Sequence, residues 1–311
     1  MKTTNRGYSD VKGDFNLICD FLIKQNEYLR SYSSWSLPRF CDWRHGLYRP
    51  RTSVANFWGK SAQLWFDAFD KLAGFVISEN GNTGFCIITS PGYRFLFKEI
   101  LEWTMQNWGN RGAQFGIEVS QKQEHEITVL EQFGFNNDST FYIRYFDLTA
   151  ELKERYPLEE GFEIIDMGST PEYREQRILR ANGFGGILDV SEEELNYQLE
   201  FYNNTHNSPI YHPDTDLCIK SKTDGIHVAC CEALIDAWNC TADVERVCTH
   251  SEYRRRGFAQ VVIQECLYRL KTMGIKKAYI TGFSKEAISL YGTLGAVDEL
   301  ELYEFVKDIN V

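Results

Sequence analysis

The sequence predicts an α+β fold arranged as two domains in tandem, and three observations lead to this expectation. The chain has 311 residues, 43% of them hydrophobic, which is enough for two ordinary cores. Strand-like and helical segments alternate in both halves, which favours helices packed on a sheet in each. Two pairs of segments also resemble each other in the same order, roughly 160 residues apart. These are SPGYRF (90–95) with HSEYRR (250–255), and EITVLEQFGF (126–135) with AISLYGTLGA (287–296).

The first half predicts a helix, two strands, a second helix and a further strand. Hydrophobic spacing with a period near 3.6 indicates the helices, and a spacing of two indicates the strands. NGNTG (80–84) is typical of a hairpin turn between two of these strands. In chain order we expect a helix over 14–30, an aromatic-rich segment over 35–50, strands over 72–79 and 85–90, a helix over 97–108 and a strand over 113–120.

A charged segment separates the two halves. LTAELKERYPLEEG (148–161) contains an interior proline and has no clear apolar face. Segments of this kind are typical of linkers. We therefore expect one domain over residues 1–150 and the other over 151–311.

The second half predicts strands at its front and a strand-loop-helix-strand unit behind them. FAQVVIQECLYRLKTMG (258–274) places apolar residues three to four positions apart, so we expect a long amphipathic helix that ends at Gly274. In chain order we expect a strand over 162–168, helices over 171–184 and 191–204, strands over 216–222, 226–236 and 241–249, this long helix, a strand over 276–283, a helix over 285–295 and a strand over 300–306.

Composition excludes several classes of function. A net charge of −11 argues against nucleic acid as a partner, because cations dominate that binding, and mildly favours a cationic amine as substrate. Nine scattered cysteines without a CxxC pair indicate reduced thiols rather than a metal site. The sequence shows neither a secretory signal nor a membrane span. We therefore expect a soluble, cytoplasmic monomer or homodimer that has no metal and binds no membrane.

A predicted anion site lies between the strand that ends at Thr249 and the helix that begins near Gly257. A helix start presents unpaired backbone N–H groups and the positive end of the helix dipole. Gly257 lets the backbone approach a phosphate, and Arg254 and Arg255 add positive charge. No GxxxxGK[ST] motif is present, so we expect a pyrophosphate held by backbone groups without a metal.

The run RRRGFA (254–259) resembles the R/Q-x-x-G-x-G/A signature of the GCN5-related N-acetyltransferases, the GNAT superfamily. AISLY (287–291), with Gly295 four residues on, resembles the family's A-x-x-LY-x-x-x-GF ending. The resemblance implies tandem domains, each with a mixed, mostly antiparallel sheet flanked by helices. It further implies transfer of an acetyl group from acetyl-CoA, a cosubstrate, to the primary amine of a small molecule by direct attack. The alternative function is a module that binds coenzyme A and has lost catalysis.

The resemblance also implies roles for individual residues. Val247 and Thr249 fall where a splayed strand offers backbone groups to the pantetheine arm and the acetyl carbonyl. The amides of residues 255–259, with Gln260 close by, fall where pyrophosphate is held, and Tyr291 falls where a phenol protonates the departing thiolate. The implied cofactor-binding set is Val247, Cys248, Thr249, Arg254, Arg255, Arg256, Gly257, Phe258, Ala259, Gln260, Ser284 and Tyr291.

Two positions depart from the family pattern, and both lie near the expected site. Ser284 stands where asparagine is usual, which puts one cofactor contact in doubt. Ala296 stands where phenylalanine is usual, which puts local packing in doubt.

The general base is predicted from the strand TADVERVCT (241–249). Alternation with a period of two puts Asp243, Glu245, Val247 and Thr249 on one side and Cys248 on the other. An attacking ammonium must lose a proton, and we expect Glu245 to accept it, with Asp243 in reserve or a water between. The alternative is that these carboxylates are solvated. A cysteine nucleophile is not expected.

The first half lacks the motif residues that the second half carries at its predicted cofactor site. Phe97 stands where Gly257 would fall, Glu99 where Ala259 would fall, and Leu130 in the place of Tyr291. A carboxylate at the helix start would repel a phosphate. We expect residues 1–150 to be a degenerate copy that binds no coenzyme A and shapes the substrate cleft; the alternative is structural support alone.

Overall fold

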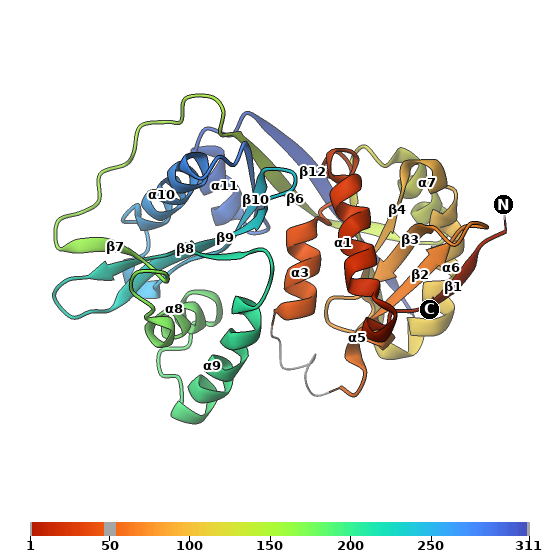
Figure 1. Cartoon of the computed structure of the whole chain (residues 1–311), viewed down its shortest axis with the longest axis horizontal. Helices are drawn as coiled ribbons and strands as arrows, with labels where there is room; N and C mark the ends of the chain where they lie inside the picture. Colours follow the sequence, from red (N-terminus) through yellow and green to blue (C-terminus); the bar gives the residue numbers. More distant parts are fainter. Residues whose placement is uncertain (1, 47–53, 310–311) are drawn as a thin grey trace. The chain divides into compact units, whose positions relative to one another are not determined.

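A computed structural model describes residues 2–46 and 54–309. The chain forms two compact units, of which unit 1 comprises Met1–Tyr142 with Leu300–Val311, and unit 2 comprises Ile143–Glu299. Figure 1 shows the elements of both units. Within the described ranges, no helix has the length and apolar character needed to cross a bilayer.

Unit 1 is a mixed sheet with helices packed on it. Strands β1 to β4 pair antiparallel with their neighbours, β4 pairs parallel with β5, and β5 pairs antiparallel with β12. Helix α6 buries Phe97, Ile100 and Leu101 in the same core as Trp65. The elements are β1 (Thr4–Gly7), α1 (Asp14–Lys24), α2 (Asn26–Arg30), α3 (Leu37–His45), α5 (Phe57–Ser61), β2 (Ala62–Phe66), β3 (Leu72–Ile77), β4 (Gly84–Thr89), α6 (Leu96–Trp108), β5 (Gln114–Ser120), α7 (Glu124–Gln132) and β6 (Asn136–Asp147).

Unit 2 has the strand order β6-β11-β10-β9-β8-β7. Strands β7 to β10 pair antiparallel, and β10 pairs parallel with β11. The sheet is therefore mixed and mostly antiparallel, as expected. The elements are β7 (Phe162–Asp166), α8 (Tyr173–Gly185), α9 (Glu192–His206), β8 (Tyr211–Ser221), β9 (His227–Asp236), β10 (Thr241–Thr249), α10 (Phe258–Thr272), β11 (Lys277–Gly282) and α11 (Lys285–Gly292). Strand β12 (Asp298–Asp308) follows α11 and passes into unit 1 at Leu300.

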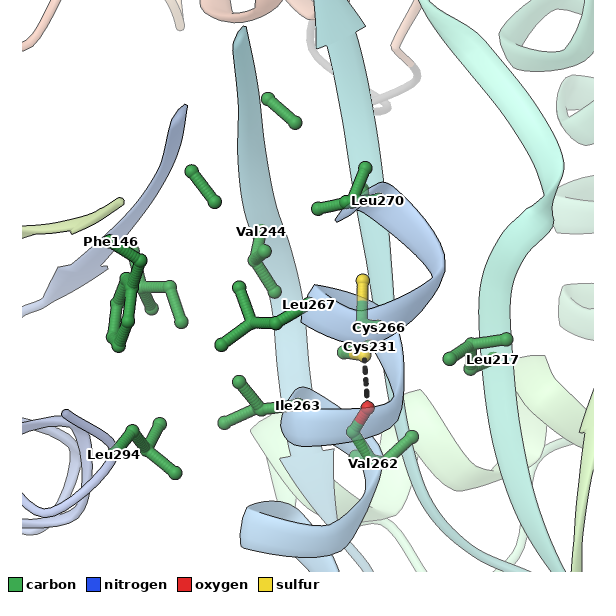
Figure 2. Packing of buried hydrophobic residues seen from close by; sticks show 14 of the residues in the cluster. Phe146, Leu217, Cys231, Val244, Val262, Ile263, Cys266, Leu267, Leu270 and Leu294 are labelled. Carbon is green, nitrogen blue, oxygen red and sulfur yellow. Dashed lines mark hydrogen bonds between the residues drawn. The ribbon is translucent and has the colours of Figure 1, made fainter. Parts of the chain in front are cut away.

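Helix α10 packs on one face of the sheet of unit 2. The spacing of its apolar residues places Ile263, Cys266, Leu267 and Leu270 on one face of the helix, where they pack in a buried core with Val244 of β10 (Figure 2). The Cys231 thiol donates a hydrogen bond to the backbone carbonyl of Val262 at 3.5 Å, which ties β9 to the helix. The amphipathic helix predicted from the sequence is thus confirmed.

The expected domain boundary near residue 150 differs from the observed division in two places. Strand β6 begins in unit 1, but the unit changes at Ile143, and residues 302–308 of β12 pair with β5 of unit 1. The sequence pattern cannot reveal this because strands that change units look like any other strand. β6 was not predicted at all, since its first four residues (136–139) are polar and exposed.

The charged segment 148–161 is an ordered strap of unit 2 rather than a linker. Side chains of α10 hold its backbone: Lys271 Nζ donates to Leu148 O at 2.8 Å, and Gln264 Oε1 accepts from Tyr156 N at 2.7 Å. Figure 1 shows the strap as the long yellow-green connection from β6 to β7. The segment lacks an apolar pattern because hydrogen bonds, more than burial, hold it in place.

Candidate active site

Strands β10 and β11 pair only at their start. The parallel ladder joins Thr241–Asp243 to Lys277–Tyr279, whereas β10 continues to Thr249 and β11 to Gly282. Past Asp243, the described residues of β10 are not paired with residues of β11. The two strands therefore separate after Asp243.

A β-bulge lies in β10 where the strands separate. Glu245 pairs with Glu232 and Cys248 pairs with Cys230, so β10 carries one more residue than β9 over this step. Arg246 at the bulge has φ of 52°, in the left-handed region. This conformation costs an ordinary residue about 1–2 kcal/mol, so surrounding contacts must hold it.

The bulge makes the predicted faces of the strand wrong. Asp243 and Glu245 do share a face, but Cys248 joins them there, because its partner Cys230 lies on the same side of β9 as Glu232. Thr249 lies instead on the opposite face, since it pairs with Ala229 of the α10-side core. The alternation predicted from the sequence failed because one extra residue moves every later side chain of the strand to the other face of the sheet.

Cys248 packs into a small buried cluster with Cys218 and Cys230 under helix α8. Its Sγ lies 3.5 Å from Cys230 Sγ. The hydrogen bond with Cys230 and burial raise the pKa of the Cys248 thiol, which keeps it protonated. The strand face predicted for Cys248 was wrong, because Cys248 shares the face of Glu245.

Tyr291 of α11 is buried beside the end of β11. A Cβ built on Gly282 would lie 3.2 Å from Tyr291 Cδ2, so the ring rests on the side-chain-free backbone of Gly282. Burial raises the pKa of the Tyr291 phenol, and the negative charge of Glu245 raises it further. The phenol therefore keeps its proton at neutral pH, and Glu245 is close enough for its charge to act on this ring.

The loop that the sequence predicts to bind an anion, residues 250–260, joins β10 to α10 and is called the anion-binding loop below. Gly257 has φ of 83° and is the N-cap of α10, and Arg255 has φ of 65°. The first backbone N–H groups of a helix have no partner within it, so those of residues 258–260 point out of the helix start. A Cβ on Gly257 would meet nothing nearer than Gln260 Oε1 at 3.8 Å, so the space beside the glycine is open. Glycine is needed at 257 for its conformation.

The three arginines of this loop have different surroundings. Arg256 Nε lies 3.1 Å from Glu159 Oε2, and its guanidinium lies 5.0 Å from the ring centre of Phe258. Arg254 Nη2 donates to Gly183 O of α8 at 3.0 Å. Arg255 is exposed. Arg254 and Arg256, both in the predicted cofactor-binding set, therefore connect the loop to other parts of unit 2.

The other predicted contact residues divide into capping, core and surface positions. The Ser284 hydroxyl accepts a hydrogen bond from Ala287 N at 3.1 Å and caps α11. Gln260 Nε2 donates to Thr293 Oγ1 at 3.1 Å. Phe258 is buried in the core of unit 2, so only its backbone can meet a ligand at the helix start.

Sequence reasoning missed a buried ionic network on the α8 face of the sheet. Arg180 Nη2 lies 2.8 Å from Glu232 Oε2 and 3.3 Å from Asp216 Oδ1. Burial and the charge of Glu232 raise the pKa of Asp216 to about 7. One signal was available: Glu232 is a lone carboxylate inside the otherwise apolar run HVACCEALI (227–235).

The corresponding helix start in unit 1 is built differently. Its N-cap, Phe95, has φ of −60°, an ordinary right-handed value. Phe97 is buried, and the Glu99 carboxylate accepts a hydrogen bond from Trp65 Nε1 at 2.9 Å. Leu130 of α7 is also buried.

Comparison with known proteins shows which family the second half of the chain resembles. Residues 187–296 match the model of the acetyltransferase (GNAT) family. A curated relative, the uncharacterized N-acetyltransferase CgeE of Bacillus subtilis, is 24% identical over 86 residues, which cover 27% of this chain. The match spans about a third of that relative's length (33%).

Two solved structures resemble the whole chain. The GCN5-related N-acetyltransferase from Sphaerobacter thermophilus has a TM-score of 0.69 at 16% identity, covering 99% of this chain and 96% of its own. A tandem GNAT protein from the clavulanic acid biosynthesis pathway has a TM-score of 0.68 at 9% identity, covering 100% and 99%. At such identities the likeness concerns the fold. Residues 187–296 are thus similar to the GNAT acetyltransferase family, and the whole chain shares the fold of a tandem GNAT protein.

Proposed function

We propose that this chain transfers an acetyl group from acetyl-CoA to the primary amine of a small molecule, by direct attack of the amine on the thioester carbonyl. One combination of features carries the proposal. An anion-binding helix start at Gly257 follows a strand that separates from its neighbour, and Glu245 on that strand acts electrostatically on the protonated phenol of Tyr291.

The residues present fit acetyl-CoA. Its pyrophosphate needs hydrogen-bond donors and open space, which the N–H groups of residues 258–260 and the uncrowded Gly257 supply. Its pantetheine arm carries amides, which need backbone partners such as those of β10 past Asp243. Bound acetyl-CoA supplies an acetyl thioester that an amine can attack.

Glu245 and Tyr291 then move protons on the two sides of the reaction. An amine is an ammonium ion at neutral pH, so a base must remove a proton before attack; Glu245 accepts it, directly or through water, with Asp243 on the same face in reserve. A backbone N–H near Val247 stabilises the negative charge that develops on the acetyl oxygen. Tyr291, whose pKa is raised, still carries the proton that it donates to the leaving sulfur.

A small cationic amine is the acceptor that the charge of the protein favours. The chain carries a net charge of −11, and Asp243 and Glu245 share the strand face at the site. A positively charged substrate gains from both the overall field and these local carboxylates. Phosphate-rich partners such as nucleic acids gain from neither.

We also propose that unit 1 binds no coenzyme A. The N-cap of α6 is Phe95, with φ of −60°, where α10 has the left-handed Gly257, and Glu99 places a carboxylate in the first turn, where it would repel a phosphate. Calorimetric titration of the full chain with acetyl-CoA should give one site per chain. A stoichiometry of two would contradict this part of the proposal.

The acetyltransferase proposal is tested with acetyl-CoA and a panel of amines. We expect acetyl-CoA to raise the thermal unfolding midpoint of the protein, because it binds the folded state. We further expect loss of thioester absorbance only when an accepted amine is present. Binding of acetyl-CoA without turnover on any amine would favour an inactive coenzyme A module. Absence of binding would refute both the acetyltransferase and the inactive module.

A further inference from the structure

A chain of buried ion pairs connects helix α8 to the bulge in β10. Arg180 of α8 pairs with Glu232 of β9 at 2.8 Å, through Nη2 and Oε2. The other carboxylate oxygen of Glu232, Oε1, pairs with Nη1 of Arg246. Only 2% of the Glu232 side chain is exposed, so both of its oxygens are committed to arginines within unit 2.

The far side of Arg180 is also anchored. Its Nη1 donates to the hydroxyl of Tyr202 at 2.8 Å, and its Nη2 lies 3.3 Å from Asp216 Oδ1. Gln176 Nε2 in turn donates to that same Asp216 oxygen at 2.6 Å. Tyr202 of α9 and Asp216 of β8 therefore hold the guanidinium, and Gln176 of α8 holds Asp216, so that Glu232 lies between the cations of Arg180 and Arg246.

Arg246 is the residue that needs such an anchor. Its φ of 52° is a left-handed conformation that only glycine adopts without cost, so it persists where contacts over-determine it. Glu232 holds its guanidinium, and the Cys230 thiol donates to its backbone carbonyl at 3.6 Å. Both anchors come from β9, directly across from the bulge.

The bulge determines the orientation of the groups on either side of Arg246. Glu245 precedes it, and the backbone N–H near Val247 follows it. If Arg246 returned to extended geometry, the bulge would be lost, and the side chain of either Glu245 or Cys248 would move to the other face of the sheet. The proton acceptor and the oxyanion donor therefore depend on one strained residue.

We propose that Glu232, fixed by Arg180, is a positioning residue: it holds Arg246 in the left-handed conformation that aims Glu245 and the following backbone N–H at the acetyl group. This inference rests on the proposed acetyl transfer. Glu232 acts through Arg246 and touches neither substrate nor cofactor.

The first test removes the charge of Glu232 and then replaces Arg246 with glycine, which adopts the left-handed conformation without an anchor. Glu232→Gln should lower kcat by about 10-fold to 100-fold, in the range expected when an oxyanion donor is misplaced, with little change in KM for acetyl-CoA, which the Gly257 region holds. Glycine adopts positive φ without strain, so adding Arg246→Gly to Glu232→Gln should restore kcat at least roughly tenfold. A double variant as slow as Glu232→Gln alone would overturn the proposal.

A second comparison does not depend on the buried carboxylate. Arg246→Ala and Arg246→Gly both remove the guanidinium, but only glycine tolerates φ of 52° freely. We expect the glycine variant to have a kcat at least roughly tenfold above that of the alanine variant. Equal values would show that the left-handed conformation is not what the reaction needs.

A matched control separates positioning from general loss of ion pairs. Asp166 of β7 pairs with Arg269 at 2.7 Å, and β7 is the edge strand of the sheet, with β8 and β9 between it and β10. Asp166→Asn should leave kcat within about threefold of the unsubstituted protein, since it does not contact the bulge. A loss equal to that of Glu232→Gln would count against a specific role.

A readout independent of turnover keeps this inference distinct from the proposed function. Amide chemical shifts of residues 245–248, measured by ¹H–¹⁵N NMR, should move in Glu232→Gln and return toward their original positions in the double variant. If no amine is acetylated but the shifts behave this way, the proposed function fails and the positioning of the bulge stands. If the unsubstituted protein acetylates an amine and Glu232→Gln leaves both kcat and the shifts unchanged, the positioning role is refuted and acetyl transfer stands.

Discussion

Gly257→Glu is the substitution that best separates the anion site from the stability of the fold. The new side chain must adopt φ of 83°, which costs about 1–2 kcal/mol for a residue with a Cβ. Its carboxylate, however, lies at the positive end of α10, which returns about 0.3–1 kcal/mol. We therefore expect the free energy of unfolding to fall by only about 1 kcal/mol.

The effect on acetyl-CoA binding should be much larger. The carboxylate occupies the helix start and repels the pyrophosphate, so hydrogen bonds from the N–H groups of residues 258–260 are lost. Hydrogen bonds to charged groups contribute about 1.5–3 kcal/mol each, so losing two costs roughly 3–6 kcal/mol. At 1.4 kcal/mol for each factor of ten, Kd should rise by roughly 100-fold or more.

Gly274→Glu is the matched control at the other end of the same helix. Gly274 has φ of 85°, and nothing lies within 4 Å of a Cβ built on it, so the backbone cost is the same. Its carboxylate meets the negative end of the helix dipole, which makes this variant less stable than Gly257→Glu. Its affinity for acetyl-CoA should nevertheless equal that of the unsubstituted protein.

Isothermal titration with acetyl-CoA should show weaker binding for Gly257→Glu than for Gly274→Glu. Urea unfolding should show lower stability for Gly274→Glu than for Gly257→Glu. If Gly257→Glu binds acetyl-CoA within about threefold of the unsubstituted protein, or if Gly274→Glu loses as much affinity, the anion-binding loop does not hold the pyrophosphate.

Three further outcomes follow from the site. Glu245→Gln and Tyr291→Phe should each lower kcat by roughly 100-fold or more in the thioester assay, as expected for lost proton transfer, and unchanged turnover in both would remove their assigned roles. Ser284→Ala removes the cap of α11 and should lower the free energy of unfolding by about 1 kcal/mol in urea, whereas an equal free energy would mean that the cap contributes nothing. Burial and the charge of Glu232 raise the pKa of Asp216 to about 7, so the folded state binds this proton more tightly than the unfolded state, and stability should fall as pH rises from about 4 to 7. Comparing urea unfolding of the unsubstituted protein with Asp216→Asn between pH 5 and 8 checks this, and parallel profiles would contradict it.

Local patterns predicted the elements around the site well. Helix α10 begins and ends near the predicted residues because its apolar spacing matches the helical period and Gly257 and Gly274 bound it. The same pattern located the loop before it, since a strand, a glycine and a helix start are all short-range features. The assignment of acetyl-CoA to that loop remains a proposal.

Patterns failed where contacts distant in sequence decide the geometry. TADVERVCT (241–249) reads as a regular strand, yet Glu232 and Cys230 of the neighbouring strand hold a bulge at Arg246. The alternating faces predicted for the carboxylates and for Thr249 were therefore only partly correct. The charged segment 148–161 likewise reads as a linker because the α10 side chains that bind it are far away in sequence.

The sequence by itself determined the α+β class, the tandem arrangement and the strand-loop-helix around Gly257, because hydrophobic period and glycine placement act over a few residues. Only the tertiary structure decided where the chain changes units, which arginines fasten the loop, and which face of β10 carries each side chain. The physical reason is that one left-handed residue reverses every later side chain of a strand, and whether that residue is tolerated depends on charges brought to it by other strands and helices.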